Sequence, residues 1–86
     1  MKVGIPTPLR SYTRERAEVE ASGVTLDELT RDLDRRYPGL RFRFIDEQER
    51  IRPHIKVFVN AEQVKDLRTR LAPTDDIAII QAFSGG

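Results

Sequence analysis

The chain has 86 residues, of which 38% are hydrophobic and 34% are charged, and it contains no cysteine. This length allows one small domain, whose core must form without a disulfide or a cysteine-based metal site. Lys and Arg total 15 against 14 Asp and Glu, so the formal charge is +1, and the interleaved signs argue against a nucleic acid or a membrane as the main partner.

The N-terminal residues predict two short strands. Residues 2–5 alternate polar or small with apolar side chains, and Pro6 and Pro8 then fix the backbone and remove hydrogen-bond donors. Residues 16–20 alternate again before a Ser-Gly pair. We expect the two strands to be joined by a loop through residues 9–13.

An amphipathic helix is predicted over residues 25–37. Thr25 offers a hydroxyl that caps the first turn, and Glu28 completes a capping box. Apolar residues recur at a spacing of three to four, at Leu26, Leu29, Leu33 and Tyr37. Opposite charges four residues apart lie on what we expect to be the outer face, Asp27 with Arg31 and Asp32 with Arg36. A Pro-Gly pair ends the helix.

Residues 41–53 mix charged and apolar side chains in a pattern that fits neither a helix nor a strand, and we expect a loop with partial structure. Its first residues, Arg41-Phe42-Arg43-Phe44, allow two interpretations. Aromatic rings between arginines can stack on RNA bases. The acidic residues that follow favour a solvated loop with buried aromatic rings instead.

The C-terminal part predicts three more strands. Residues 55–60 are rich in β-branched side chains and lead through a turn into a short apolar return at Val64 and Leu67. Residues 77–83 have the most strand-like pattern in the chain. The whole order predicts an α+β fold, a mixed sheet with the first and last strands adjacent and parallel and the helix packed on one face as the crossover between them.

Strand periodicity assigns side chains to the two faces of this sheet. If Ile77 and Ile79 face the helix, alternate residues of the last strand face outward, together with Phe58 of its neighbour. We expect an exposed apolar patch that binds partners, at Phe58, Ile80, Ala82 and Phe83. Two alternatives remain open: residues 41–53 cover Phe58, or the two faces are exchanged.

Catalytic residues are scarce. His54 is the one histidine, and without a cysteine or a second histidine it favours a solvent-facing or strand-edge position over a metal or catalytic role. No apolar run approaches the roughly 20 residues of a membrane span, and the N-terminus has no signal-peptide core. We therefore expect a cytoplasmic carrier or binding protein, not an enzyme, with no bound cofactor or metal.

The chain also contains several short motifs, the last of which is Ala82-Phe83-Ser84-Gly85-Gly86. The others are residues 5–10, 22–26, 37–39 and 59–62, with Leu33 and Asp75. Together they resemble the ubiquitin-like β-grasp sulfur carriers of the MoaD/ThiS family over nearly the whole chain. The Ile-Pro-Thr opening and the Ala-x-x-Gly-Gly ending look closest to CysO-type carriers, and generic MoaD-like proteins match nearly as well. Thr74 and Gln81 depart from the family, which often has glycine and proline there.

The resemblance implies a β-grasp domain over residues 1–83 and a flexible diglycine tail over residues 84–86. In this family a partner enzyme of the MoeB/ThiF type uses ATP to adenylate the terminal carboxylate, here that of Gly86, and sulfur from a donor then replaces AMP to give a thiocarboxylate. Glycine suits this chemistry, because a terminal residue without Cβ leaves the carbonyl open to attack and Gly85 lets the backbone enter a narrow channel.

The same resemblance implies an acceptor enzyme, such as a cysteine synthase or the large subunit of molybdopterin synthase. The chain is then a protein co-substrate. Two other functions stay open: a ubiquitin-like modifier that is conjugated to lysine, and a non-covalent β-grasp interaction module.

Overall fold

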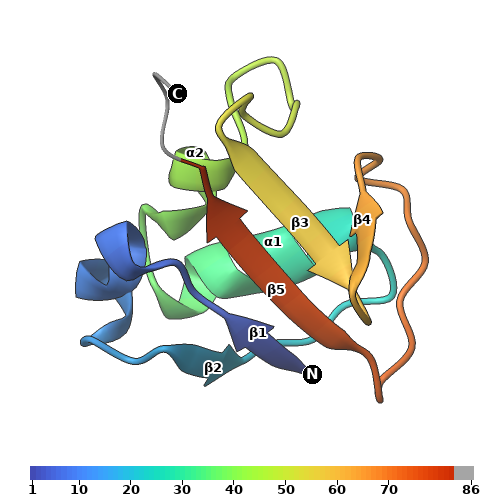
Figure 1. The fold of residues 1–86 in the computed structure, drawn as a ribbon, viewed down its shortest axis with the longest axis horizontal. Helices are drawn as coiled ribbons and strands as arrows, with labels where there is room; N and C mark the ends of the chain where they lie inside the picture. The colour runs from blue at the N-terminus through green and yellow to red at the C-terminus, as the bar shows by residue number, and fades with distance from the viewer. Residues whose placement is uncertain (83–86) are drawn as a thin grey trace.

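The structure, a computed structural model, describes residues 1–82 of the chain. Five strands form one mixed sheet in the order β2-β1-β5-β3-β4. The strands are β1 (Lys2–Gly4), β2 (Glu18–Glu20), β3 (Ile55–Val59), β4 (Glu62–Val64) and β5 (Asp76–Gln81). β1 pairs with β5 in parallel and all the other pairs are antiparallel. The predicted α+β fold is therefore confirmed, with the first and last strands side by side (Figure 1).

The helix α1 (Leu26–Arg36) crosses one face of the sheet (Figure 1). Its apolar stripe is in the core, with Leu26, Leu29 and Leu33 at most 1% exposed. The Thr25 Oγ1 accepts the N–H of Glu28 at 3.2 Å, which is the predicted cap. The Glu28 carboxylate accepts from the N–H of Val24 at 3.1 Å, and not from that of Thr25, so the predicted capping box is only half formed.

Asp32 was predicted on the outer face of the helix, and this prediction is wrong. Its side chain is only 7% exposed, because it turns toward the segment after β2 and accepts the N–H of Ser22 at 2.9 Å. Arg35 and Arg36 also donate to it, Arg36 Nε at 2.9 Å. Burial raises the pKa of Asp32, but these hydrogen bonds outweigh it and lower the pKa to about 2.

Residues 41–53 are more ordered than the predicted loop. A short helix, α2 (Leu40–Phe44), follows α1, and a β-bridge joins Ile45 to Ile51. Phe44 is buried as predicted, but Phe42 is 52% exposed, so the prediction of buried aromatic rings is half wrong.

The segment predicted as a loop between β1 and β2 is a 3-10 helix, η1 (Thr7–Thr13). Pro8 lies in its first turn, where a missing N–H costs nothing. Thr13 is fully buried and its hydroxyl hydrogen-bonds to the carbonyls of Arg10 and Arg16, at 3.1 and 2.9 Å. β2 then begins at Glu18, two residues later than predicted.

The two C-terminal strands also differ at their ends from the sequence prediction. β4 ends at Val64, before Leu67, and β5 begins at Asp76. Phe83, predicted as the last residue of β5, lies outside the described residues. No helix within residues 1–82 is long and apolar enough to cross a lipid bilayer.

Candidate functional site

The turn between β3 and β4 fixes the start of β5. Asn60 and Ala61 have positive φ angles of 50° and 71°, which fit a tight hairpin turn. The Asn60 side chain donates to Asp75 Oδ1 at 2.8 Å and accepts the N–H of Asp76 at 2.9 Å. Hydrogen bonds from the Ala72 N–H and the Asn60 side chain lower the pKa of Asp75. These hydrogen bonds therefore fix the alignment of β5 with β3 at the end where β5 begins.

That register sets which side chains of β5 face outward. Ile77 and Ile79 are 3% and 2% exposed, on the helix side as predicted. Ile80, between them and the C-terminus, is 46% exposed. On β3, Phe58 pairs with Ala78 and is half-buried, while Lys56 pairs with Ile80 and is exposed.

Segment 41–53 does not pack as a lid over this outward face. Its buried residues Phe44 and Ile45, and Leu40 just before it, belong to the core cluster with α1, and α2 contacts α1 and η1. The two alternatives left open by the sequence, a covered Phe58 and exchanged faces, are therefore not the arrangement in this structure. Phe58 is half-buried among its neighbours on the sheet.

The outward face carries an exposed apolar side chain, Ile80, near the end where the chain leaves β5, and the exposed Lys56 lies beside it on β3. Because β1 runs parallel to β5, Gly4 lies beside Ala78 and Lys2 beside Asp76. A surface hollow next to Ile80 is lined by apolar and small residues of β1, β5 and the segment after β1, and also by two charged residues, Arg10 and Glu18. Three charged residues, Lys2, Glu20 and Asp76, lie at the opposite end of the same face.

The predicted reactive residues, Gly85 and Gly86, lie outside the described residues, as does Phe83. Ala82, the last described residue, is half-buried, and its N–H donates to the carbonyl of His54 at 2.7 Å. The contribution of His54 here is therefore a backbone hydrogen bond at the end of the sheet. The structure brings Phe58 and Ile80 to the outward face, and Ala82 follows directly after β5.

Sequence reasoning missed the contribution of β1 to this face. Gly4 and Pro6 line the hollow beside Ile80, but a glycine and a proline carry no periodic signal of their own. The parallel pairing of the first and last strands was predicted, and extending it residue by residue places Gly4 against Ala78. The contribution of β1 to this face could therefore have been found from the predicted pairing of β1 with β5, but not from the residue types of β1.

A five-stranded mixed sheet with one long helix on one face defines a ubiquitin-like β-grasp protein. The chain belongs to the ThiS family, which matches residues 3–86. It is 36% identical to the sulfur carrier protein CysO of Mycobacterium tuberculosis, over 98% of this chain and 96% of that protein.

Two solved structures show the same similarity in three dimensions. One is the crystal structure of the Amycolatopsis orientalis BexX/CysO complex, with a TM-score of 0.91 and 35% identity over 99% of this chain and 98% of that one. The other is the crystal structure of the small archaeal modifier protein SAMP1 from Haloferax volcanii. Its TM-score is 0.79, with 25% identity over 100% of this chain and 98% of that one.

Proposed function

We propose that this chain is a sulfur carrier whose terminal Gly86 is adenylated and then converted to a thiocarboxylate. The observation that carries the proposal is the Gly85-Gly86 ending of a chain that belongs to the ThiS family and is similar, over nearly its full length, to proteins named CysO sulfur carriers. The domain arrangement that goes with it is a β-grasp domain over residues 1–83 and a tail over residues 84–86.

The chemistry divides between this chain and a partner enzyme of the MoeB/ThiF type. The Gly86 carboxylate attacks the α-phosphorus of ATP on that enzyme and displaces pyrophosphate, which leaves an acyl adenylate. A sulfur nucleophile from the donor then forms a C–S bond with the carbonyl carbon as AMP leaves. The chain supplies the acyl carbon and needs no thiol, in keeping with its lack of cysteine. It is a co-substrate and binds no cofactor itself.

We assign the outward face to partner binding. Phe58 and Ile80 lie on it, and Ala82 and Phe83 follow directly after β5 in the chain. Exposed apolar side chains such as Ile80, which is 46% exposed, mark protein interfaces. Ile80 lies next to the last residue of β5, so one enzyme can hold this face and the reacting glycine together, with the half-buried Phe58 farther along the same face beside Ala78. The similarity to CysO in its complex with BexX supports a role in binding partner proteins.

The similarity to CysO also favours a cysteine synthase as the enzyme that receives the sulfur, in the cytoplasm. A large molybdopterin synthase subunit is the second candidate acceptor. A second function, conjugation of Gly86 to lysine, is favoured by the similarity to the small archaeal modifier protein. Both functions share the adenylation step.

Intact mass spectrometry separates these functions. The full chain is incubated with ATP, its activating enzyme and a sulfide source, and a chain that lacks Gly86 serves as the matched control. A carrier gains the mass difference between sulfur and oxygen, and a modifier gains the mass of a second protein. An unchanged mass in the presence of an active enzyme contradicts both and leaves a non-covalent interaction module.

A further inference from the structure

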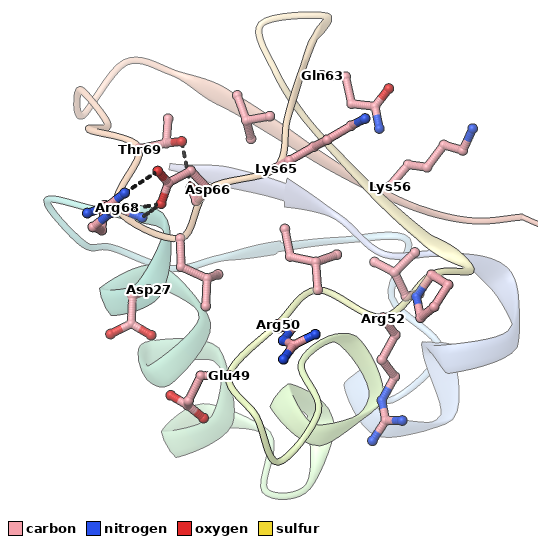
Figure 2. A pocket seen from close by; sticks show the side chains of 15 residues that line it. Asp27, Glu49, Arg50, Arg52, Lys56, Gln63, Lys65, Asp66, Arg68 and Thr69 are labelled. Atoms are coloured by element: carbon pink, nitrogen blue, oxygen red, sulfur yellow. Dashed lines mark hydrogen bonds and ion pairs between the residues drawn. The ribbon is translucent and has the colours of Figure 1, made fainter.

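A surface groove of about 1150 Å³ lies along β4, between segments 49–56 and 63–69 (Figure 2). We call it the β4 groove. Its volume exceeds the range of about 300–1,000 Å³ that is usual for small-molecule pockets, which suits a segment of polypeptide better than a metabolite. Apolar residues from both walls line it: Ile51, Pro53, Ile55, Val64 and Leu67.

The acidic residues of the β4 groove are already neutralised within the chain. Asp27 and Glu49 both pair with Arg31 and Arg41, and the shortest contacts of Arg41 to them are 2.8 and 3.1 Å. Two carboxylates and two guanidiniums therefore balance each other. Asp66 pairs with Arg68 at 3.1 Å in the same way, as the dashed lines in Figure 2 show.

Four cations of the groove have no such balance: Arg50, Arg52, Lys56 and Lys65. None of them forms an ion pair with a carboxylate among residues 1–82. Arg50 and Arg52 come from one wall, Lys56 comes from β3, and Lys65 directly follows β4 (Figure 2). Within the β4 groove, each carboxylate is therefore paired inside the chain while these four cations are not.

Arg52 is held in place before any partner arrives. Its Nε donates to the carbonyl of Phe42 at 2.8 Å, and its guanidinium lies 4.5 Å from the centre of the Phe42 ring. This cation–π contact restrains the side chain and leaves other guanidinium N–H groups for a carboxylate. Pre-organised side chains lose less entropy on binding, so Arg52 is suited to recognition.

We propose that the β4 groove binds an acidic segment of a partner protein, with aliphatic side chains on the apolar residues and carboxylates on the four unpaired cations. Charge complementarity selects an acidic occupant. A nucleic acid fits less well, because no aromatic ring lines the groove for base stacking. The inference goes beyond the proposed carrier function and does not depend on it.

The test uses the full chain labelled with ¹⁵N and a short peptide in which Leu alternates with Glu and Asp. In an extended peptide this alternation places leucines on one face and carboxylates on the other. We expect amide signals of residues 50–56 and 63–68 to shift on titration. The same peptide with Ser for Leu, or with Lys for the acidic residues, should bind at least about tenfold more weakly, because it lacks the apolar or the charged half of the contact.

Charge reversal supplies the matched control. Arg50→Glu/Lys65→Glu should weaken binding of the acidic peptide at least about tenfold, because it reverses two of the unpaired cations. Arg14→Glu/Arg16→Glu makes the same change in net charge near β2, at the opposite edge of the sheet, on two exposed side chains. It should leave the affinity within about twofold, and a thermal melt checks that each variant is folded.

Three results would overturn the proposal. The first is the absence of shifts in segments 50–56 and 63–68 at saturating acidic peptide. The second is equal weakening by both double variants, which indicates a general charge effect. The third is tighter binding of an oligothymidylate than of the peptide at these residues, which makes the groove a nucleic-acid site.

Discussion

At the scale of single residues, Gly23 is required by close packing rather than by an unusual φ angle. A Cβ on Gly23 would lie 2.5 Å from the backbone N of Leu29 and 2.9 Å from its Cα. Backbone atoms inside a helix cannot move aside cheaply, so Gly23→Ala should destabilise the fold by about 1 to 3 kcal/mol, as overpacking does. The free energy of unfolding is measured by urea denaturation.

Gly4→Ala is the control for Gly23→Ala. Its Cβ would lie 3.8 Å from Ala78 Cα and Ile77 O, an ordinary contact, so we expect a change within about 0.5 kcal/mol. If the two substitutions destabilise the fold equally, the close contact of Gly23 with the backbone of α1 is not the reason that this position requires glycine.

The lowered pKa of Asp32 predicts that the stability of the fold decreases as the pH falls. Its pKa falls from the usual 3.8 to about 2 in the folded chain, so its ionised form stabilises the fold above pH 4, and this contribution is lost as the pH drops toward 2. Asp32→Asn should therefore cost on the order of 1 to 2 kcal/mol at pH 7. The difference from wild type should shrink as the pH falls from about 4 to 2.

The measurement is urea denaturation of both proteins across that pH range. Glu62→Gln is the control, because Glu62 is exposed on β4 and makes no ion pair or side-chain hydrogen bond within residues 1–82. Its unfolding free energy should track that of wild type at every pH. A wild-type advantage over Asp32→Asn that is independent of pH would refute the assignment to ionised Asp32.

At the scale of elements, α1 was predictable because its signals are local. Its cap and its apolar stripe lie within one short stretch of sequence, whereas α2 depends on distant residues. Arg41 is 13% exposed and donates to Thr30 at 3.0 Å and to Asp27 at 2.8 Å, both on α1. Such contacts leave no periodic pattern in segment 41–53, so the sequence indicated only partial structure there. The burial of Asp32 was missed for the same reason, since its partner Ser22 lies outside the helix.

The packing of α1 on the sheet predicts large effects at its leucines. Leu29 and Leu33 are completely buried, so Leu29→Ala or Leu33→Ala should destabilise by about 2 to 5 kcal/mol. Val24→Ala, just before the helix at a side chain that is 54% exposed, should change stability by less than about 0.5 kcal/mol. Urea denaturation of the three variants tests this, and a small effect at both leucines would contradict the packing.

At the scale of the whole molecule, the sequence indicated the outward face of the sheet better than the β4 groove. Alternation along β5 and β3 located Phe58 and Ile80, because a strand has a strict period of two. The β4 groove joins residues from α1, segment 49–53 and the chain after β4. Its unpaired charge depends on which ion pairs form in the folded chain, and no spacing rule in the sequence gives that.

The proposed carrier function predicts that binding and chemistry can be separated, because the outward face proposed to bind the enzyme and the reacting group are different parts of the chain. Deleting Gly86 leaves Gly85 as the terminal carboxylate, which stops up to about 3.5 Å short of the adenylation site. A misplacement of about 1 Å can already cost on the order of 100-fold in rate. We therefore expect ATP–pyrophosphate exchange with the activating enzyme to be nearly undetectable, while binding to that enzyme and the melting temperature are unchanged.

Ile80→Asp should have the opposite effect, weaker binding to the activating enzyme with the reacting glycine intact. The side chain is 46% exposed, so the substitution should change the melting temperature little, while binding to the activating enzyme weakens because an apolar contact at the interface is replaced by a charge. At saturating concentration of the variant, exchange should approach the wild-type rate, since Gly86 is intact. If Ile80→Asp unfolds the domain, the outward position of Ile80 is wrong, and if the Gly86 deletion exchanges pyrophosphate at the wild-type rate, Gly86 is not the reacting group.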